Sequence, residues 1–183
     1  SKINNGDETE MINLILSEIN KLIELTNATF IYIAIDGTAP KAKMIQQRIR
    51  RLKSVLEMKS WDTNAITPGT NFMNKLNNEL HNSFNSTQNI IISDSLDPGE
   101  GEHKILQYLK EHKKSFKNKK NCIYGLDADL IMLALVSGIP NMYLLREKTS
   151  FNIEQINGDY LYLKVDNLKK EITSNFPGLM KQT

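Results

Sequence analysis

The stretch Phe30-Ile-Tyr-Ile-Ala-Ile35 is a nearly continuous apolar run that ends directly in Asp36-Gly37. Short runs of this kind are typical of strands that are buried on both faces, as in parallel sheets. The same form recurs at Asn89-Ile-Ile-Ile-Ser93, at Cys122-Ile-Tyr-Gly-Leu126 and at Asn141-Met-Tyr-Leu-Leu145. These four runs predict the strands around which the rest of the chain folds.

Helical patterns lie between the strand-like runs. Residues 11–25 place apolar side chains on one face at helical spacing, and four further helices are expected at 42–59, 71–82, 102–114 and 129–137. A last strand at 160–165 precedes a helix that runs to Ile172, with Asp166-Asn167 as its expected cap. Alternating strands and helices predict an α/β fold with a mostly parallel central sheet flanked by helices.

Length and composition indicate a single globular domain over residues 1–183, since 40% of the residues are hydrophobic and 24% are charged. The apolar run at 130–136 is much shorter than the ~20 residues of a membrane span, so no membrane partner is expected. Cys122 is the only cysteine, which excludes an internal disulfide and disfavours a thiolate zinc site. We expect a cytoplasmic protein, with the nucleus as the alternative location.

Acidic residues follow three of the predicted strands. Asp36 follows the first, Glu100 and Glu102 follow the second after a turn, and Asp127 and Asp129 follow the third. The carboxyl ends of parallel strands meet at one edge of a sheet, where ligands bind in open α/β folds. Five clustered carboxylates repel one another, and a divalent cation relieves this repulsion. Oxygen ligands of this kind favour Mg²⁺ or Mn²⁺ over zinc.

Each acidic motif also has a structural interpretation. Asp127-Ala-Asp129 resembles an ordinary turn or helix cap, and Asp97 with Glu100 has the spacing of a capping box. A helix of 3.6 residues per turn separates residues two apart by about 200°, so Glu100 and Glu102 cannot both face one ion from within a helix. We therefore expect Glu100 before the helix and Glu102 in its first turn, with Gly101 allowing the bend.

A basic segment complements these acids. Residues 40–53 carry six basic side chains and no acid, a local charge of +6. On a helix, Lys43, Gln47, Arg50 and Arg51 fall on one face. Such a face predicts a phosphate pocket. The alternative is a solvated helix surface, which the absence of balancing acids disfavours.

Three other features have weaker functional interpretations. Residues 110–120 hold six lysines and one acid, and we interpret them as solvated surface, with nucleic-acid contact as the alternative. Trp61, the only tryptophan, fits a core position better than a base-stacking platform. His103 follows Glu102 and is either a neighbour of the metal site or a helix-surface residue.

Four motifs occur in order and cover most of the chain from about residue 30 onward. They are Ala34-Ile-Asp-Gly-Thr-Ala-Pro-Lys-Ala-Lys-Met-Ile-Gln-Gln-Arg-Ile-Arg-Arg51, Asn64-Ala-Ile-Thr-Pro-Gly-Thr70, Pro98-Gly-Glu-Gly-Glu-His-Lys104 and Tyr124-Gly-Leu-Asp-Ala-Asp-Leu-Ile-Met132. Together they resemble the N-terminal nuclease domain of the eukaryotic and viral Xrn-type 5′-to-3′ exoribonucleases. The resemblance implies a nuclease fold of the PIN/flap-nuclease type.

The resemblance also implies Mg²⁺- or Mn²⁺-dependent hydrolysis of RNA that carries a 5′-monophosphate, in RNA degradation. The residues that it implies are the metal-binding, catalytic acids Asp36, Glu100, Glu102, Asp127 and Asp129, and the 5′-phosphate ligands Lys43, Gln47, Arg50 and Arg51. No stretch before Ile12 resembles the acid-bearing first strand of that family, so we expect a domain that is incomplete at both ends. Two alternatives are a catalytically incomplete RNA-binding or scaffold module and a flap-type DNA nuclease of the same superfamily.

Overall fold

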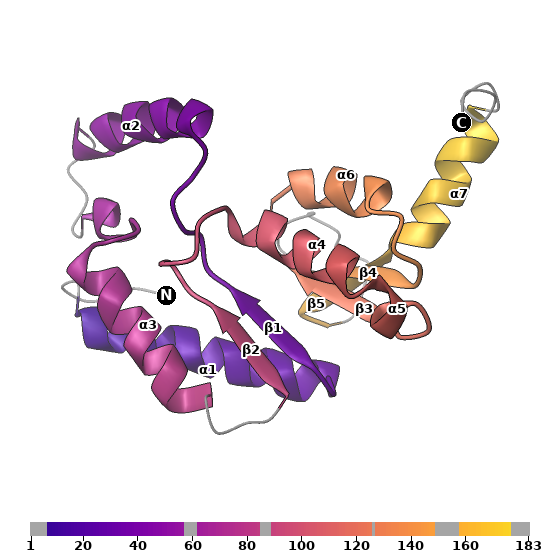
Figure 1. The fold of residues 1–183 in the computed structure, drawn as a ribbon, viewed down its shortest axis with the longest axis horizontal. Helices are drawn as coiled ribbons and strands as arrows, with labels where there is room; N and C mark the ends of the chain where they lie inside the picture. The colour runs from indigo at the N-terminus through magenta and orange to yellow at the C-terminus, as the bar shows by residue number, and fades with distance from the viewer. Residues whose placement is uncertain (1–6, 57–61, 85–88, 126, 149–157, 177–183) are drawn as a thin grey trace. The chain divides into compact units, whose positions relative to one another are not determined.

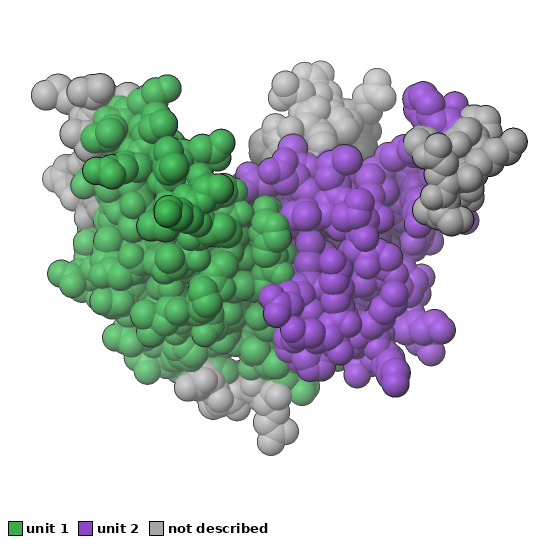
Figure 2. Space-filling model, turned by 45° about the horizontal axis from the view of Figure 1, so that its top comes forward, with its two compact units in different colours: residues 1–104 green, residues 105–183 purple. Residues whose placement is uncertain are grey.

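The computed structural model describes residues 7–56, 62–84, 89–125, 127–148 and 158–176. The chain divides into two compact units, residues 1–104 and 105–183, coloured green and purple in Figure 2. Trp61 and Leu126, like residues 57–59 of one predicted helix, lie outside the described residues.

The first unit places helices around a pair of parallel strands (Figure 1). Its elements are α1 (Glu8–Thr26), β1 (Ile31–Ala34), α2 (Lys41–Leu56), the short 3-10 helix η1 (Thr63–Ala65), α3 (Asn71–Phe84), β2 (Ile90–Ser93) and the start of α4 (Gly101–Glu111). β1 pairs with β2 in parallel, from Ile31 opposite Ile90 to Ala34 opposite Ser93. The two strands therefore end at the same edge, as predicted.

The core of this unit forms between the helices and the strands. α1 and α3 supply its buried side chains, which are Ile12, Phe72, Met73, Leu76, Leu80 and Phe84. Ile33 of β1 and Ile92 of β2 pack against this cluster. At the start of α1, the Asp7 carboxylate accepts the N–H of Thr9 at 2.9 Å, and this cap fixes where the helix begins.

The second unit contains a three-stranded sheet. Its elements are α5 (Lys113–Phe116), β3 (Asn121–Tyr124), α6 (Asp129–Val136), β4 (Met142–Glu147), β5 (Tyr160–Lys164) and α7 (Val165–Asn175). β4 lies in the middle, parallel to β3 and antiparallel to β5. Buried residues such as Met142 and Leu144 form its core with α6 and α7. The α/β class is thus confirmed, and the single, mostly parallel central sheet stays a prediction.

Two local expectations need correction. The predicted helix over 102–114 is divided between α4 and α5, which meet at His112. Asp166 does not cap α7, because the helix already begins at Val165. Its Oδ2 instead accepts the N–H of Asn141 at 3.0 Å, which ties the start of α7 to the turn before β4. Among the residues described, we find no helix with the length and apolarity that a membrane crossing requires.

Candidate metal and phosphate site

The loops that follow β1 and β2 are joined by backbone hydrogen bonds. Gly37 N–H donates to the Gly99 carbonyl at 2.8 Å, and Gly99 N–H donates to the Thr38 carbonyl at 3.0 Å. Gly99 has a φ of +104°, a conformation that favours glycine. A Cβ at Gly37 would overlap the Asp97 carbonyl. The glycines therefore allow the two loops to approach closely.

Asp36 is held against the first residue of α4. Its Oδ1 accepts the N–H of Gly101 at 2.6 Å. The first N–H groups of a helix lack partners within the helix and carry its positive partial charge, so a carboxylate is favourable there. A Cβ at Gly101 would lie 3.1 Å from the Ala34 carbonyl oxygen and 3.2 Å from Oδ1 of Asp36. Glycine thus brings the end of β1 and the start of α4 together.

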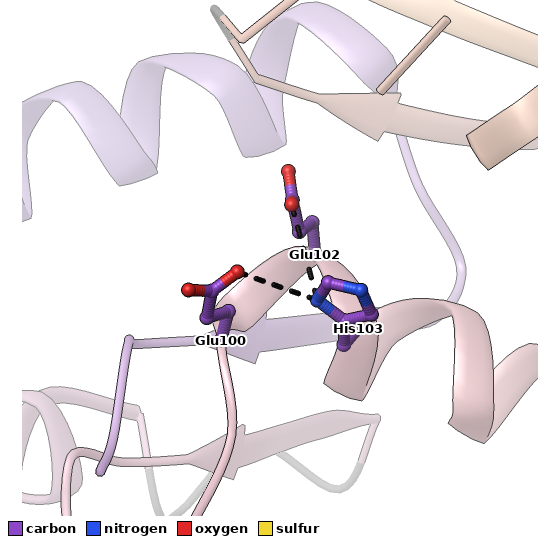
Figure 3. Close-up of side chains that lie close together, drawn as sticks. All are labelled: Glu100, Glu102 and His103. Atoms are coloured by element: carbon purple, nitrogen blue, oxygen red, sulfur yellow. Dashed lines mark ion pairs between the residues drawn. The ribbon is translucent and has the colours of Figure 1, made fainter. Parts of the chain in front are cut away.

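Glu100, Glu102 and His103 form a cluster at the start of α4 (Figure 3). Glu100 precedes the helix and Glu102 lies in its first turn, which confirms the prediction. One ligand atom from each of the three residues lies within 4.8 Å of the others. Nδ1 of His103 is 3.5 Å from Oε2 of Glu100 and 3.9 Å from Oε1 of Glu102. Two carboxylates and one imidazole are a ligand set that can hold a divalent cation.

Glu100 is the buried member of this cluster, and Lys43 of α2 pairs with it. The Lys43 ammonium lies 2.8 Å from Oε1 of Glu100 and donates to Oε2 at 2.9 Å. Oε1 is buried, and its short contact with the ammonium is an ion pair without hydrogen-bond geometry. The hydrogen bond to Glu100 outweighs desolvation and, with the charges of Glu100, Glu102 and Asp36, raises the pKa of Lys43.

The residues of the predicted phosphate-binding face all lie on one helix, α2. Lys43, Gln47 and Arg51 recur at every fourth position and are half-buried, whereas Arg50 is exposed. Lys43 connects this face to the acidic cluster through Glu100. This ion pair therefore places the basic face of α2 beside the acidic cluster at the start of α4.

Asp127 and Asp129 belong to the second unit, and both are exposed. Asp129 is the first residue of α6, and Ala128 occupies the cap position without a side-chain hydrogen bond. Ala128 lies in a turn, so of the two structural interpretations the turn agrees with the structure and an aspartate at the helix cap does not. The convergence of these two acids with Asp36, Glu100 and Glu102 stays a prediction.

Sequence reasoning missed Lys104 and Asp94 as parts of this region. The Lys104 ammonium donates to the Ile35 carbonyl at 2.8 Å and to the Asp94 carbonyl at 2.7 Å. Burial lowers the pKa of Lys104, and the nearby charges of Asp97, Asp94 and Asp36 oppose this. The Asp94 carboxylate lies 3.1 Å from Nε2 of His81. The available signals for Lys104 were its position one helical turn after Glu100 and its place at the end of the motif that begins at Pro98.

Comparison with known proteins identifies the family to which this chain belongs. A family model described as the XRN 5′-3′ exonuclease N-terminus matches residues 1–60 and 54–148. The 5′-3′ exoribonuclease 2 of Eremothecium gossypii is 38% identical over 181 residues, which cover 76% of this chain and 19% of that protein. The 5′-3′ exoribonucleases 1 of Schizosaccharomyces pombe and Saccharomyces cerevisiae are each 39% identical, over 79% of this chain and over 13% and 11% of their own lengths. The chain thus spans less than a fifth of these relatives.

Proposed function

We propose, because this chain belongs to the XRN 5′-3′ exonuclease N-terminus family, that it is part of a hydrolase that removes nucleotides from the 5′ end of RNA. The observation that carries the proposal is the meeting of Asp36, Glu100 and Glu102 at the shared end of β1 and β2, beside Lys43. Anionic metal ligands beside a cationic helix face suit a phosphodiester substrate. An enzyme that removes nucleotides from the 5′ end of RNA would act in RNA degradation.

The metal-binding acids of this proposal are Asp36, Glu100, Glu102, Asp127 and Asp129. Two Mg²⁺ or Mn²⁺ ions, when bound, supply an activated water and stabilise the leaving 3′-oxygen. The protein's own contribution is to hold the carboxylates in place, and the Gly101 N–H does this for Asp36. The buried Oε1 of Glu100 supports its role as a ligand.

The substrate of this proposal is RNA with a 5′-monophosphate, bound by Lys43, Gln47, Arg50 and Arg51. Charge-assisted hydrogen bonds from lysine and arginine suit a terminal phosphate. A pocket fitted to a single phosphate would exclude a cap or a triphosphate. Binding of the terminal phosphate then sets which phosphodiester lies at the acids.

Three further points belong to the same proposal. The two compact units belong to one nuclease domain of the PIN/flap-nuclease type, a fold with a mostly parallel central sheet. The domain is the N-terminal part of a longer enzyme. Its place of action is the cytoplasm, with the nucleus as the alternative, which a single cysteine suits.

The test compares three substrates in the presence of Mg²⁺: RNA with a 5′-monophosphate, the same RNA with a 5′-hydroxyl, and DNA with a 5′-monophosphate. We expect rapid loss of nucleotides from the 5′ end of the first substrate only. Equal rates on the two RNAs would contradict the phosphate pocket. Faster hydrolysis of DNA would favour a flap-type nuclease, and RNA binding without Mn²⁺ binding or hydrolysis would favour a scaffold.

A further inference from the structure

Lys104 connects α4 to the ends of both strands of the first unit. Its backbone N–H donates to the Glu100 carbonyl at 3.0 Å, which places it one turn into the helix. Its ammonium donates to the carbonyls of Ile35 and Asp94 at 2.8 and 2.7 Å. Ile35 directly precedes Asp36, and Asp94 directly follows β2. One side chain therefore fixes the position of three segments that carry the candidate site.

The burial of Lys104 needs a physical reason. The residue is only 8% exposed, although lysine is among the residues least often buried. Burying a charged ammonium costs free energy, because water can no longer solvate it fully. An apolar side chain of similar volume would fill the same space without this cost. What the ammonium adds is the pair of hydrogen bonds to the two carbonyls.

The two carbonyls belong to the segments that position the acids. The Ile35 N–H continues the strand pairing by donating to the Ser93 carbonyl at 2.9 Å. The backbone at Ile35, whose carbonyl accepts from Lys104, is therefore still held by the strand pair. The next residue, Asp36, accepts the Gly101 N–H, and Gly101 lies between Glu100 and Glu102. If α4 moved away from the strand ends, the carboxylate of Asp36 would separate from those of the two glutamates.

We propose that Lys104 is a positioning residue that keeps Asp36 and the start of α4 together, so that Asp36, Glu100 and Glu102 are arranged to bind a divalent cation. The inference rests on the proposed function and assigns a role to a residue outside the proposed sets of metal ligands and phosphate ligands. Its site is the junction of β1, β2 and α4.

The direction in which cation affinity changes when Lys104 is replaced distinguishes a positioning role from a purely electrostatic role. Lys104 places a positive charge near Asp36, Asp94 and Asp97. Removing that charge would by itself strengthen the binding of a cation. Loss of positioning has the opposite result, because the carboxylates would repel one another and move apart.

The experiment titrates the chain with Mn²⁺ by isothermal calorimetry, as wild type and as Lys104→Met, Lys104→Arg and Leu80→Ala. We expect Lys104→Met to weaken Mn²⁺ binding at least tenfold, and Lys104→Arg to bind more tightly than Lys104→Met because it keeps the donors. Leu80→Ala removes a buried core side chain of the same unit and controls for general loosening. All variants are compared at a temperature at which circular dichroism shows them folded.

A second measurement does not depend on the metal. Because the hydrogen bond from the Gly101 N–H to Asp36 is short, we expect the Gly101 amide proton to resonate downfield in the NMR spectrum. We expect this signal to shift upfield in Lys104→Met and to stay in place in Leu80→Ala. If Lys104→Met does not fold, Lys104→Gln replaces it under the same criteria.

The outcomes separate this inference from the proposed function. Equal or tighter Mn²⁺ binding by Lys104→Met, or an equal loss in Leu80→Ala, would overturn the positioning role. A wild-type chain that binds no Mn²⁺ would contradict the proposed metal site itself. In that case an unchanged Gly101 signal in Lys104→Met would also overturn the positioning role, whereas an upfield shift would support it.

Discussion

The ammonium of Lys43 lies 2.8 Å from Oε1 of Glu100, although the two residues are 57 positions apart in the chain. The side chain of Glu100 is 7% exposed and that of Lys43 is 40% exposed, so the pair has a buried acidic end and an open basic end. A buried carboxylate requires such a partner. The pair therefore connects the proposed metal ligands to the proposed phosphate-binding face of α2.

Lys43→Met should reduce the preference for a 5′-phosphate. A hydrogen bond to a charged group is worth about 1.5–3 kcal/mol, so we expect the ratio of rates on 5′-phosphorylated and 5′-hydroxyl RNA to fall by about tenfold or more. The measurement is kcat/KM on the two RNAs. Lys53→Met, an exposed substitution in the last turn of the same helix, is the matched control. An unchanged ratio in Lys43→Met would exclude this lysine from the pocket.

Asp127→Asn should abolish hydrolysis while RNA binding is retained. The loss of a carboxylate that holds a catalytic ion removes transition-state stabilisation, and we expect kcat to fall by about 10²-fold or more. Asp127 is exposed, so the free energy of unfolding should change by less than about 0.5 kcal/mol. Single-turnover kinetics and fluorescence anisotropy measure the two effects. Asp159→Asn, an exposed acid of the same unit, should leave both unchanged.

Acid should weaken the fold through Asp94. Burial favours the neutral carboxyl, but the hydrogen bonds from the Leu96 N–H and from His81 together outweigh it, so the pKa of Asp94 is lowered from its ordinary value of 3.8. The stabilisation is therefore fully present above pH 3.8 and is lost as the pH falls through the lower folded-state pKa. Urea unfolding at several pH values measures it. Asp94→Asn should lose less unfolding free energy than the wild type as the pH falls over the acidic range. An equal loss in the two proteins would show that the Asp94 carboxylate is not responsible.

Gly37→Ala should destabilise the first unit. The new methyl group would overlap the carbonyl oxygen of Asp97, a backbone atom that cannot move aside easily. Overpacking of this kind costs about 1–3 kcal/mol or more. Gly69→Ala provides a comparison, because its Cβ meets no neighbouring atom but must adopt a φ of +89°, at a cost of about 1–2 kcal/mol. Thermal and urea unfolding distinguish the two, and an unaffected Gly37→Ala would mean that the loops are further apart.

The local pattern of the sequence was sufficient for the elements of the first unit and for part of the site. Each short apolar run became a strand, and apart from the break at His112 and the last residue of α6's predicted range, the described parts of the predicted helices are helical. Residue spacing is a local property of the chain, so the sequence alone predicts such elements. The placement of Asp36 beside Glu100 and Glu102 followed from parallel pairing of β1 with β2. The position of Glu100 outside α4 followed from helix periodicity together with the expectation that Glu100 and Glu102 face one ion.

Only the tertiary structure decided the direction of β5, the pairing of Lys43 with Glu100 and the burial of Lys104. An apolar run has the same pattern whether its neighbour is parallel or antiparallel, so direction is not encoded locally. A lysine at position 104 has the sequence signature of a solvated helix residue. Its buried role depends on the carbonyls of Ile35 and Asp94, and these come within reach of its ammonium only when the strands and α4 have packed.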